Sequence, residues 1–200
     1  MMPPTSATMR SRDAARDRLR ELGGIGAGHA ANSLARLLGR TVRMHPPHFA
    51  SCRRAVGALP LARFDLGVFF EIDGGPGGTL AVLFPGASRD ALLRTLLGDV
   101  ACDEKEGAPP DLREAHAALA ESALREVGNI LASSVVSAIA DTLGARILPS
   151  LPDLVLAGAG RRLDALARQR GDEGAVCVET EIFDDTGELQ GLVALLPASD

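Results

Sequence analysis

Two long stretches of the chain repeat apolar residues at the spacing of an α-helix. In residues 12–38 apolar positions recur every three or four residues, and Gly39 follows as a C-terminal glycine. Residues 112–143 repeat the pattern and end before Gly144. We predict a long amphipathic helix for each stretch, with its apolar stripe facing the core.

Shorter runs rich in β-branched and aromatic residues follow each predicted helix. TVRM (41–44) and ARIL (145–148) predict one short strand each, in front of proline pairs. Hairpins are predicted for ARFDLGVFFEI with TLAVLFP, across the turn DGGPGG, and for AVCVETEIF with LQGLVALLP, across DDTGE. SRDALLRTLLGD and RRLDALARQR predict two short helices.

The two long helical stretches are related by a constant offset. The segment that starts at Asp17 aligns without a gap with the segment that starts at Ser122, and 105 residues separate Glu21 from Glu126. An offset held over a whole segment indicates an internal duplication.

We therefore predict a single domain, residues 1–200, made of two internal repeats. Repeat 1 covers residues 12–98, repeat 2 covers 112–197, and the charged, Pro- and Gly-rich segment 99–111 connects them. Each repeat is expected to run helix, strand, helix, strand, strand. The predicted fold class is α/β, with two pseudo-symmetric repeats forming a continuous, mainly antiparallel sheet packed against two long helices.

The charge and aromatic content exclude some partners. The chain carries a net charge of −5 at pH 7 and contains no Trp or Tyr. An acidic chain offers no broad positive field for nucleic acid, and stacking platforms for bases are not expected. A role directed at another protein fits this composition better.

The cysteines and the apolar runs bear on the compartment. Cys52, Cys102 and Cys177 form no CxxC pair and are too few for a disulfide framework, which favours a reducing, cytoplasmic location. The first residues lack the apolar core of a signal peptide, and no later run offers about 20 uncharged apolar residues. We expect neither export nor a membrane span.

Three polar residues share one face of the second predicted helix. Ser122, Glu126 and Asn129 are spaced i, i+4 and i+7. At 100° per residue, Glu126 lies about 40° to one side of Ser122 and Asn129 about 20° to the other, opposite the apolar stripe. Such a triplet is usually a solvated helix face. The amide, the proline at Pro152 and the partial copy in repeat 1 favour a functional site.

These residues carry a resemblance to a known family. The order Asp or Ser, three residues, Glu, two residues, Asn, twenty-two residues, Pro is similar to that of the CheC, CheX and FliY phosphatases of bacterial chemotaxis. Ser122, Glu126, Asn129 and Pro152 match it at every position. ELGGIGAGHAANSLARLLGR, which starts at Glu21, also resembles the family's first helix, and the likeness extends from about residue 12 to residue 197.

The resemblance implies a reaction and a partner. The substrate would be the phosphorylated aspartate of a CheY-like response regulator, with Asn129 holding the attacking water through its amide and Glu126 contacting a lysine of the regulator. Ser122 would make a secondary contact, and Pro152 would shape the neighbouring loop. No cofactor is expected in this chain, and Mg²⁺ is expected in the regulator.

Repeat 1 holds a degenerate version of the same pattern. It keeps Asp17, Glu21 and Pro47 but has Gly24 where the amide is expected. Because glycine has no side chain to hold a water, we predict a site that docks a regulator through Glu21 with little or no hydrolysis.

Two other functions remain as alternatives. One is a non-catalytic docking or scaffold module that binds a response regulator or a CheD-like deamidase. The other is a flagellar-switch phosphatase resembling FliY, which is disfavoured because it needs a further switch-binding domain. We favour the phosphatase because a scaffold has no need of both Glu126 and Asn129 on one exposed face.

Some local patterns suggest other chemistry. GAGHAA formally matches a dinucleotide fingerprint, but no strand precedes it and no acidic residue lies between Glu21 and Asp65, so we reject it. His45, His48 and Cys52 lie close together in sequence, but a second cluster with zinc spacing is missing, and we predict no metal site.

The first helix also contains four glycines, at positions 23, 24, 26 and 28. Each costs about 1 kcal/mol relative to alanine inside a helix. Close backbone packing between the helices would account for this cost.

Overall fold

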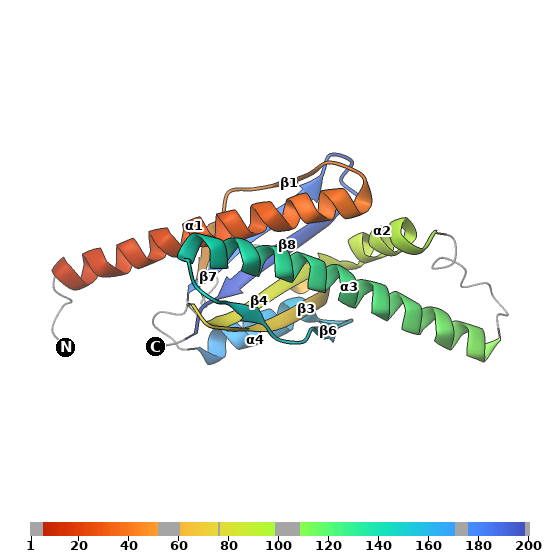
Figure 1. Ribbon diagram of the computed structural model, residues 1–200. Coiled ribbons are helices and arrows are strands. Elements are labelled where there is room, and N and C mark those ends of the chain that lie inside the picture. Colours follow the sequence, from red (N-terminus) through yellow and green to blue (C-terminus); the bar gives the residue numbers. More distant parts are fainter. Residues whose placement is uncertain (1–5, 52–60, 76, 99–108, 171–175, 199–200) are drawn as a thin grey trace.

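The computed structural model describes residues 6–51, 61–75, 77–98, 109–170 and 176–198. Its helices and strands are shown in Figure 1. In chain order they are α1 (Ser6–Leu38), β1 (Val42–Met44), β2 (His48–Ser51), the 3-10 helix η1 (Leu61–Arg63), β3 (Phe64–Asp73), β4 (Gly78–Pro85), α2 (Gly86–Leu97), α3 (Pro110–Leu143), β5 (Leu148–Pro149), β6 (Asp153–Val155), α4 (Ala159–Gln169), β7 (Val176–Asp184) and β8 (Gln190–Leu196).

The described strands form one sheet. Its hydrogen-bonded order is β1-β7-β8-β4-β3-β5, with β2 also paired to β7 and β6 also paired to β3. Every pairing is antiparallel. The predicted continuous antiparallel sheet is confirmed, and its two halves interleave, because β1 and β2 pair with a strand of the C-terminal half and β5 and β6 with one of the N-terminal half.

The long helices lie side by side on one face of the sheet, and α4 covers the other face (Figure 1). Helix α1 packs over β7 and β1, whereas α3 packs over β3 and β4 and beside β5 and β6. The prediction of a sheet backed by two long helices is therefore confirmed. The arrangement leaves the outer flank of α3 next to the β5–β6 edge.

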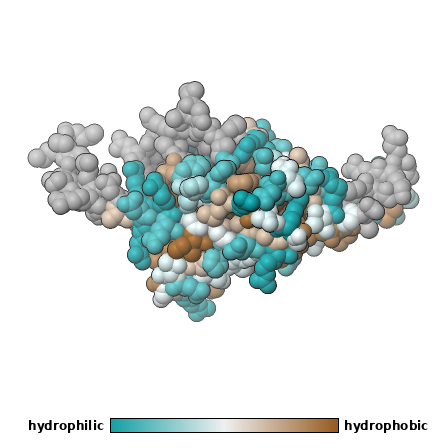
Figure 2. All heavy atoms as spheres, turned by 90° about the horizontal axis from the view of Figure 1, so that it is seen from above, coloured by the Kyte–Doolittle hydropathy of each residue, from teal (hydrophilic) through white to brown (hydrophobic). Residues whose placement is uncertain are grey.

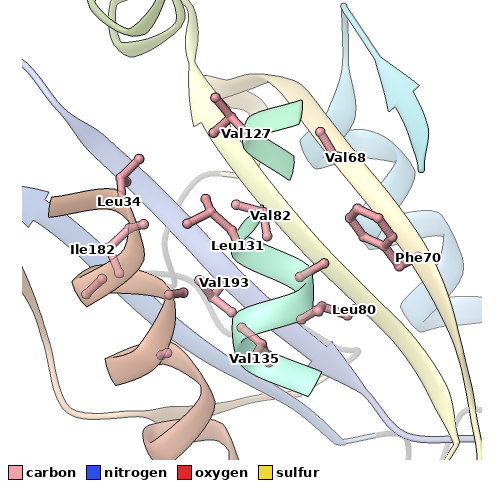
Figure 3. Close-up of a cluster of buried hydrophobic side chains, with 14 of the residues drawn as sticks. Leu34, Val68, Phe70, Leu80, Val82, Val127, Leu131, Val135, Ile182 and Val193 are labelled. Carbon is pink, nitrogen blue, oxygen red and sulfur yellow. The ribbon is translucent and has the colours of Figure 1, made fainter. Parts of the chain in front are cut away.

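Two layers of apolar side chains hold the sheet to its helices. Figure 3 shows the larger one, in which Leu34 of α1 and Leu131 of α3 meet Val82 and Val193 of the central strands. The smaller layer lies under α4 and includes Phe69 and Leu163. Because the central strands are covered on both faces, their sequences are nearly continuous apolar runs. Each buried leucine contributes about 1.5–3 kcal/mol.

The glycines of α1 allow the close packing expected from the sequence. A Cβ atom on Gly26 would lie 2.8 Å from Cγ1 of Val135 on α3, and one on Gly23 would lie 2.5 Å from Cγ1 of Val178 on β7. Both positions are buried. The expected close packing between the two long helices is confirmed at Gly26, and the close contact of Gly23 with the sheet was not expected.

Several predicted boundaries differ from the structure. Helix α1 begins at Ser6 rather than at 12, α3 begins at Pro110 rather than at 112, and strand pairing in ARIL starts only at Leu148. Strands β2 and β6 were not predicted, because each is four residues or shorter and follows a proline. The predicted connector lies outside the described residues except for its last positions.

The predicted order of helix, strand, helix, strand, strand is wrong for the first half. Helix α2 follows the β3–β4 hairpin, whereas α4 precedes the β7–β8 hairpin. Between β2 and β3 the described part of the first half has only the 3-10 turn η1, which packs against α4.

The strand pairings of the first half correspond to those of the second half at constant sequence offsets. Met44 of β1 pairs with Ile182, and Pro149, which is 105 positions later, pairs with Ile72. His48 pairs with Glu179, and the residue 105 positions after His48 pairs with Phe69. In both comparisons the partner strands are offset by 110 positions. The internal duplication and its pseudo-symmetry stay predictions, with which these registers agree.

Helix α3 is long and apolar enough to cross a membrane by length and composition alone. Half of its most apolar window is buried within the protein. The buried apolar residues of α3 belong to the core between the helices and the sheet.

Candidate functional site

Helix α3 is fixed in rotation by contacts on two sides. Gly128 lies on the sheet, where an added Cβ atom would be 2.7 Å from Cγ2 of Val68. On the flank toward α1, the hydroxyl oxygens of Ser134 and Ser33 are 2.6 Å apart. At 100° per residue, Ser134 lies about 120° from Gly128 in one direction around the axis. The remaining flank of α3 thus faces away from α1.

The candidate residues lie on that remaining flank. Asn129 is about 100° from Gly128, in the direction opposite to Ser134, and this direction leads to the β5–β6 edge. Ser122 falls within about 20° of Asn129, and Glu126 is turned further toward solvent. Ser122 and Glu126 are exposed and Asn129 is half-buried. The expected outward orientation of the triplet is confirmed.

The side chains of Glu126 and Asn129 have no partner within the described part of the chain that would compete with a bound group. Within the described part of the chain, neither Glu126 nor Asn129 makes a hydrogen bond or an ion pair, whereas the neighbouring Arg125 is paired with Glu121 at 3.0 Å. A carboxylate and an amide on one helix face are therefore free to bind an incoming group.

Pro152 lies in the short segment that joins β5 to β6. Both strands pair with β3, through Pro149 with Ile72 and through Asp153 with Phe69, so the segment is held at both ends. Helix α3 packs against both strands. The structure therefore brings the half-buried Pro152 to the same edge of the sheet that the Asn129 flank of α3 faces.

The segment before Pro152 is further tied to β3 by hydrogen bonds. The backbone N–H of Ser150 donates to the carbonyl of Glu71 at 2.8 Å, and the N–H of Glu71 donates to Oγ of Ser150 at 3.0 Å. On the other side of Pro152, Asp153 pairs with Arg162 of α4, whose guanidinium lies over the ring of Phe69. The edge of the site is thus a fixed element.

The first copy of the pattern has a different local geometry. Asp17 and Glu21 are exposed on α1, and Gly24 is half-buried. A Cβ atom on Gly24 would lie 3.0 Å from Cγ of Pro47. The structure therefore brings Gly24 and Pro47 together, and a side chain at position 24 would begin in tight contact with the proline ring.

The residues considered as metal ligands are placed in other contacts. The ring of His45 stacks on Phe183 with centroids 4.6 Å apart, and Nε2 of His48 lies 3.6 Å from a carboxylate oxygen of Glu179. Cys52 lies outside the described residues. Over the described ranges, no group of three or more His, Cys, Asp or Glu side chains is arranged to hold a metal ion.

Sequence reasoning missed two residues next to the site. Ser150 ties the segment to β3, and Leu151, directly before Pro152, is 88 % exposed. No periodic pattern in the sequence marks either residue, because both positions depend on the pairing of β3 with two short, distant segments.

Comparison with known proteins gives two matches at the level of sequence. The model of the CheC-like family matches residues 15–50 and 119–156, which contain the first and second copies of the pattern. The chain is 32% identical over 195 residues to the CheY-P phosphatase CheC of Bacillus subtilis, covering 92% of this chain and 88% of that protein.

Solved structures with the same fold are more distant in sequence. FliY of Thermotoga maritima matches with a TM-score of 0.61 and 18% identity, over 98% of this chain and 92% of that chain. The CheX–CheY–BeF3–Mg²⁺ complex of Borrelia burgdorferi matches with a TM-score of 0.57 and 14% identity, over 86% of this chain and 95% of that chain. These likenesses concern the fold.

Proposed function

The chain belongs to the CheC-like family, and we propose that it hydrolyses the aspartyl phosphate of a phosphorylated CheY-like response regulator. The observation that carries the proposal is the pair of exposed Glu126 and half-buried Asn129, which have no partners among the described residues and lie on the flank of α3 that faces the edge with Pro152. The relative that shares about a third of its residues is named a CheY-P phosphatase.

The reaction needs little chemistry from this chain. Water attacks phosphorus in line, an oxygen–phosphorus bond forms, and the bond to the aspartyl oxygen breaks to leave inorganic phosphate and a free carboxylate. Charge on the phosphoryl oxygens is neutralised by the Mg²⁺ that belongs to the regulator substrate. What remains is the placement of one water molecule.

Asn129 is the residue that places this water. Its amide both accepts and donates a hydrogen bond, and because it is neutral it adds no negative charge beside the phosphoryl group. Asn129 is half-buried on a helix, and a group held in position before the reaction lowers the entropy cost of holding water in line. Orientation of this kind supplies about a hundredfold in rate, equal to about 2.7 kcal/mol of barrier.

Glu126 and the flanking residues position the regulator. The exposed carboxylate of Glu126 pairs with a lysine next to the phosphorylated aspartate, which sets the register of docking. Ser122, one turn earlier, contacts the rim. Pro152 cannot react, and it gives the facing edge a fixed shape because its φ is restricted.

A non-catalytic role makes a different prediction. A docking module for a response regulator or a CheD-like deamidase would bind the regulator without accelerating loss of its phosphate. The free amide of Asn129 favours the phosphatase, because docking through Glu126 alone would not need it.

The test measures phosphate release from a phosphorylated CheY-like regulator of the same organism, with and without the protein. Acceleration that saturates with regulator concentration is expected. Binding of the beryllofluoride-activated regulator, measured in parallel, separates the alternatives. Tight binding without any acceleration would reject the phosphatase and favour the docking module. The absence of both binding and acceleration would reject both functions.

A further inference from the structure

The described part of the chain exposes few large apolar side chains, and all of them belong to the second half of the sequence. All of them lie between residues 112 and 156, on the first half of α3 and around β5 and β6. They are Leu112, Leu119, Leu148, Leu151 and Leu156. On the face seen from above, the surface is mostly hydrophilic with small, separate apolar patches (Figure 2). The exposed leucines are therefore local features of the second half.

Leu151 stands out because it is 88 % exposed, against 48 % for Leu148, which has the next highest value. Its exposure follows from the pairing of the edge. Between the pairs Ile72–Pro149 and Phe69–Asp153, two residues of β3 oppose the three residues 150–152. An extra residue in one strand bends the chain outward. Leu151 occupies the middle of this bulge.

The bulge is held by hydrogen bonds on the side that precedes Leu151. Ser150 exchanges two hydrogen bonds with the backbone of Glu71, and its hydroxyl also donates to the carbonyl of Leu151 at 2.9 Å. On the other side the fixed φ of Pro152 restricts the chain. The side chain is thus exposed on a preorganised backbone, which lowers the entropy cost of using it in an interface.

The position of Leu151 ties it to the candidate site. It is bonded to Pro152, on the edge that the Asn129 flank of α3 faces. A protein whose phosphorylated group reaches Asn129 must therefore cover this edge as well. In the first copy the position 105 residues earlier is Pro46, so that copy lacks both the amide and the leucine.

We infer that Leu151 is the apolar anchor that the response regulator contacts when its phosphorylated group reaches Asn129. The inference rests on the proposed function and adds to it the residue that sets affinity. One exposed side chain near polar contacts suits a transient signalling complex, in which few residues carry most of the binding energy.

A second copy of the chain fits this surface less well. A twofold interface centred here would bring Glu126 close to Glu126 of the other copy, and like charges across an interface are unfavourable. The small apolar area is also below what a permanent dimer buries. The response regulator is therefore the partner that we expect to cover Leu151.

The chain provides a matched control in Leu148. Leu148 is also exposed and lies on β5, where it pairs with Asp73 of β3. In the adjacent pair, Ile72 and Pro149, the side chain of Ile72 packs on the larger core cluster beneath the long helices. Since strand residues alternate between faces, Leu148 projects from the opposite face of the sheet. Truncating it removes a similar apolar side chain away from the site.

The experiment compares Leu151→Ala and Leu148→Ala with the wild type. We expect Leu151→Ala to raise KM for the phosphorylated regulator about tenfold with kcat unchanged, and to weaken binding of the beryllofluoride-activated regulator by the same factor. Leu148→Ala should change neither. Because Leu151 is exposed, the variant should unfold at the same temperature as the wild type.

Two results would overturn the inference. One is an unchanged KM and Kd for Leu151→Ala. The other is a concentration-dependent mass in sedimentation that falls when Leu151 is truncated, which would assign the leucine to self-association. If the wild type binds the regulator without hydrolysing its phosphate, the proposed function fails, and the binding measurement still decides whether Leu151 is the anchor.

Discussion

Gly128 of α3 lies directly on Val68 of β3, and a Cβ atom at position 128 would be 2.7 Å from Cγ2 and 2.8 Å from Cβ of that valine. This contact sets the depth and rotation of α3 on the sheet. Asn129 is the next residue, so its direction toward the β5–β6 edge depends on the contact. The position of the candidate amide is thus coupled to a glycine that has no chemical role.

Substitution of Gly128 should therefore affect both stability and activity. Gly128→Ala places a methyl group against a buried, branched side chain, and such overpacking costs about 1–3 kcal/mol. Because α3 must lift or turn to relieve it, we expect kcat to fall about tenfold or more. Urea denaturation gives the first quantity and the phosphate-release assay the second.

Gly23→Ala is the matched control for this prediction. A Cβ atom there would lie 2.5 Å from Cγ1 of Val178, so a similar loss of stability is expected. Gly23 belongs to α1, so kcat should change little. A variant pair in which both substitutions lower kcat equally would show that activity follows stability rather than the placement of Asn129.

The first copy should not be repaired by restoring its amide. In the Asn129→Ala background we expect Gly24→Asn to recover no measurable hydrolysis, because Cγ of Pro47 lies 3.0 Å from the position of the new Cβ atom. The phosphate-release assay with the double variant measures this. Recovery to near the wild-type rate would show that the missing amide was the sole defect of that site.

Asp184, at the end of β7, should make stability depend on acid pH. Burial by itself raises the pKa of this carboxyl, but hydrogen bonds from Thr186 and the N–H of Leu189, together with the charge of Arg40, outweigh it and lower the pKa below its ordinary value. A group with a lowered folded pKa stabilises the protein fully above its unfolded pKa, about 3.9 for aspartate. This contribution is lost as the pH falls through the lower folded pKa.

The measurement is the free energy of unfolding in urea at several pH values from 7 down to 3. For Asp184→Asn we expect a shallower fall below about pH 4 than for the wild type, because this pH-dependent contribution is absent. Asp185→Asn is the control, since Asp185 is exposed and pairs with the exposed Arg43. An equal fall in wild type and Asp184→Asn would contradict the assignment.

Much of the fold was predictable because its long elements have strong periodicity. The stripe that contains Leu34 predicted α1, and the apolar runs around Val82 and Val193 predicted central strands. Strands β2 and β6 were missed because they are too short to show a period. The helix that follows TLAVLFP was predicted at its correct place in the sequence, but the order given for both halves put the short helix before the hairpin, which is wrong for the first half.

The candidate site was predictable to the level of a helix face. Spacing alone placed Ser122, Glu126 and Asn129 on one side of α3. The contacts of Gly128 with the sheet and of Ser134 with α1 show that this side faces away from α1, toward the β5–β6 edge. The exposure of Leu151 was not predictable, because it depends on strand pairing between β3 and two short distant segments. Such long-range pairing leaves no periodic trace in the sequence.

The most direct test of the account is the rate of phosphate loss from a phosphorylated CheY-like regulator, with wild type, Asn129→Ala and Glu21→Ala compared side by side. The account predicts that Asn129→Ala lowers kcat about a hundredfold while the variant still binds the beryllofluoride-activated regulator, and that Glu21→Ala leaves kcat unchanged. A wild-type kcat in Asn129→Ala, with the regulator bound, would contradict it.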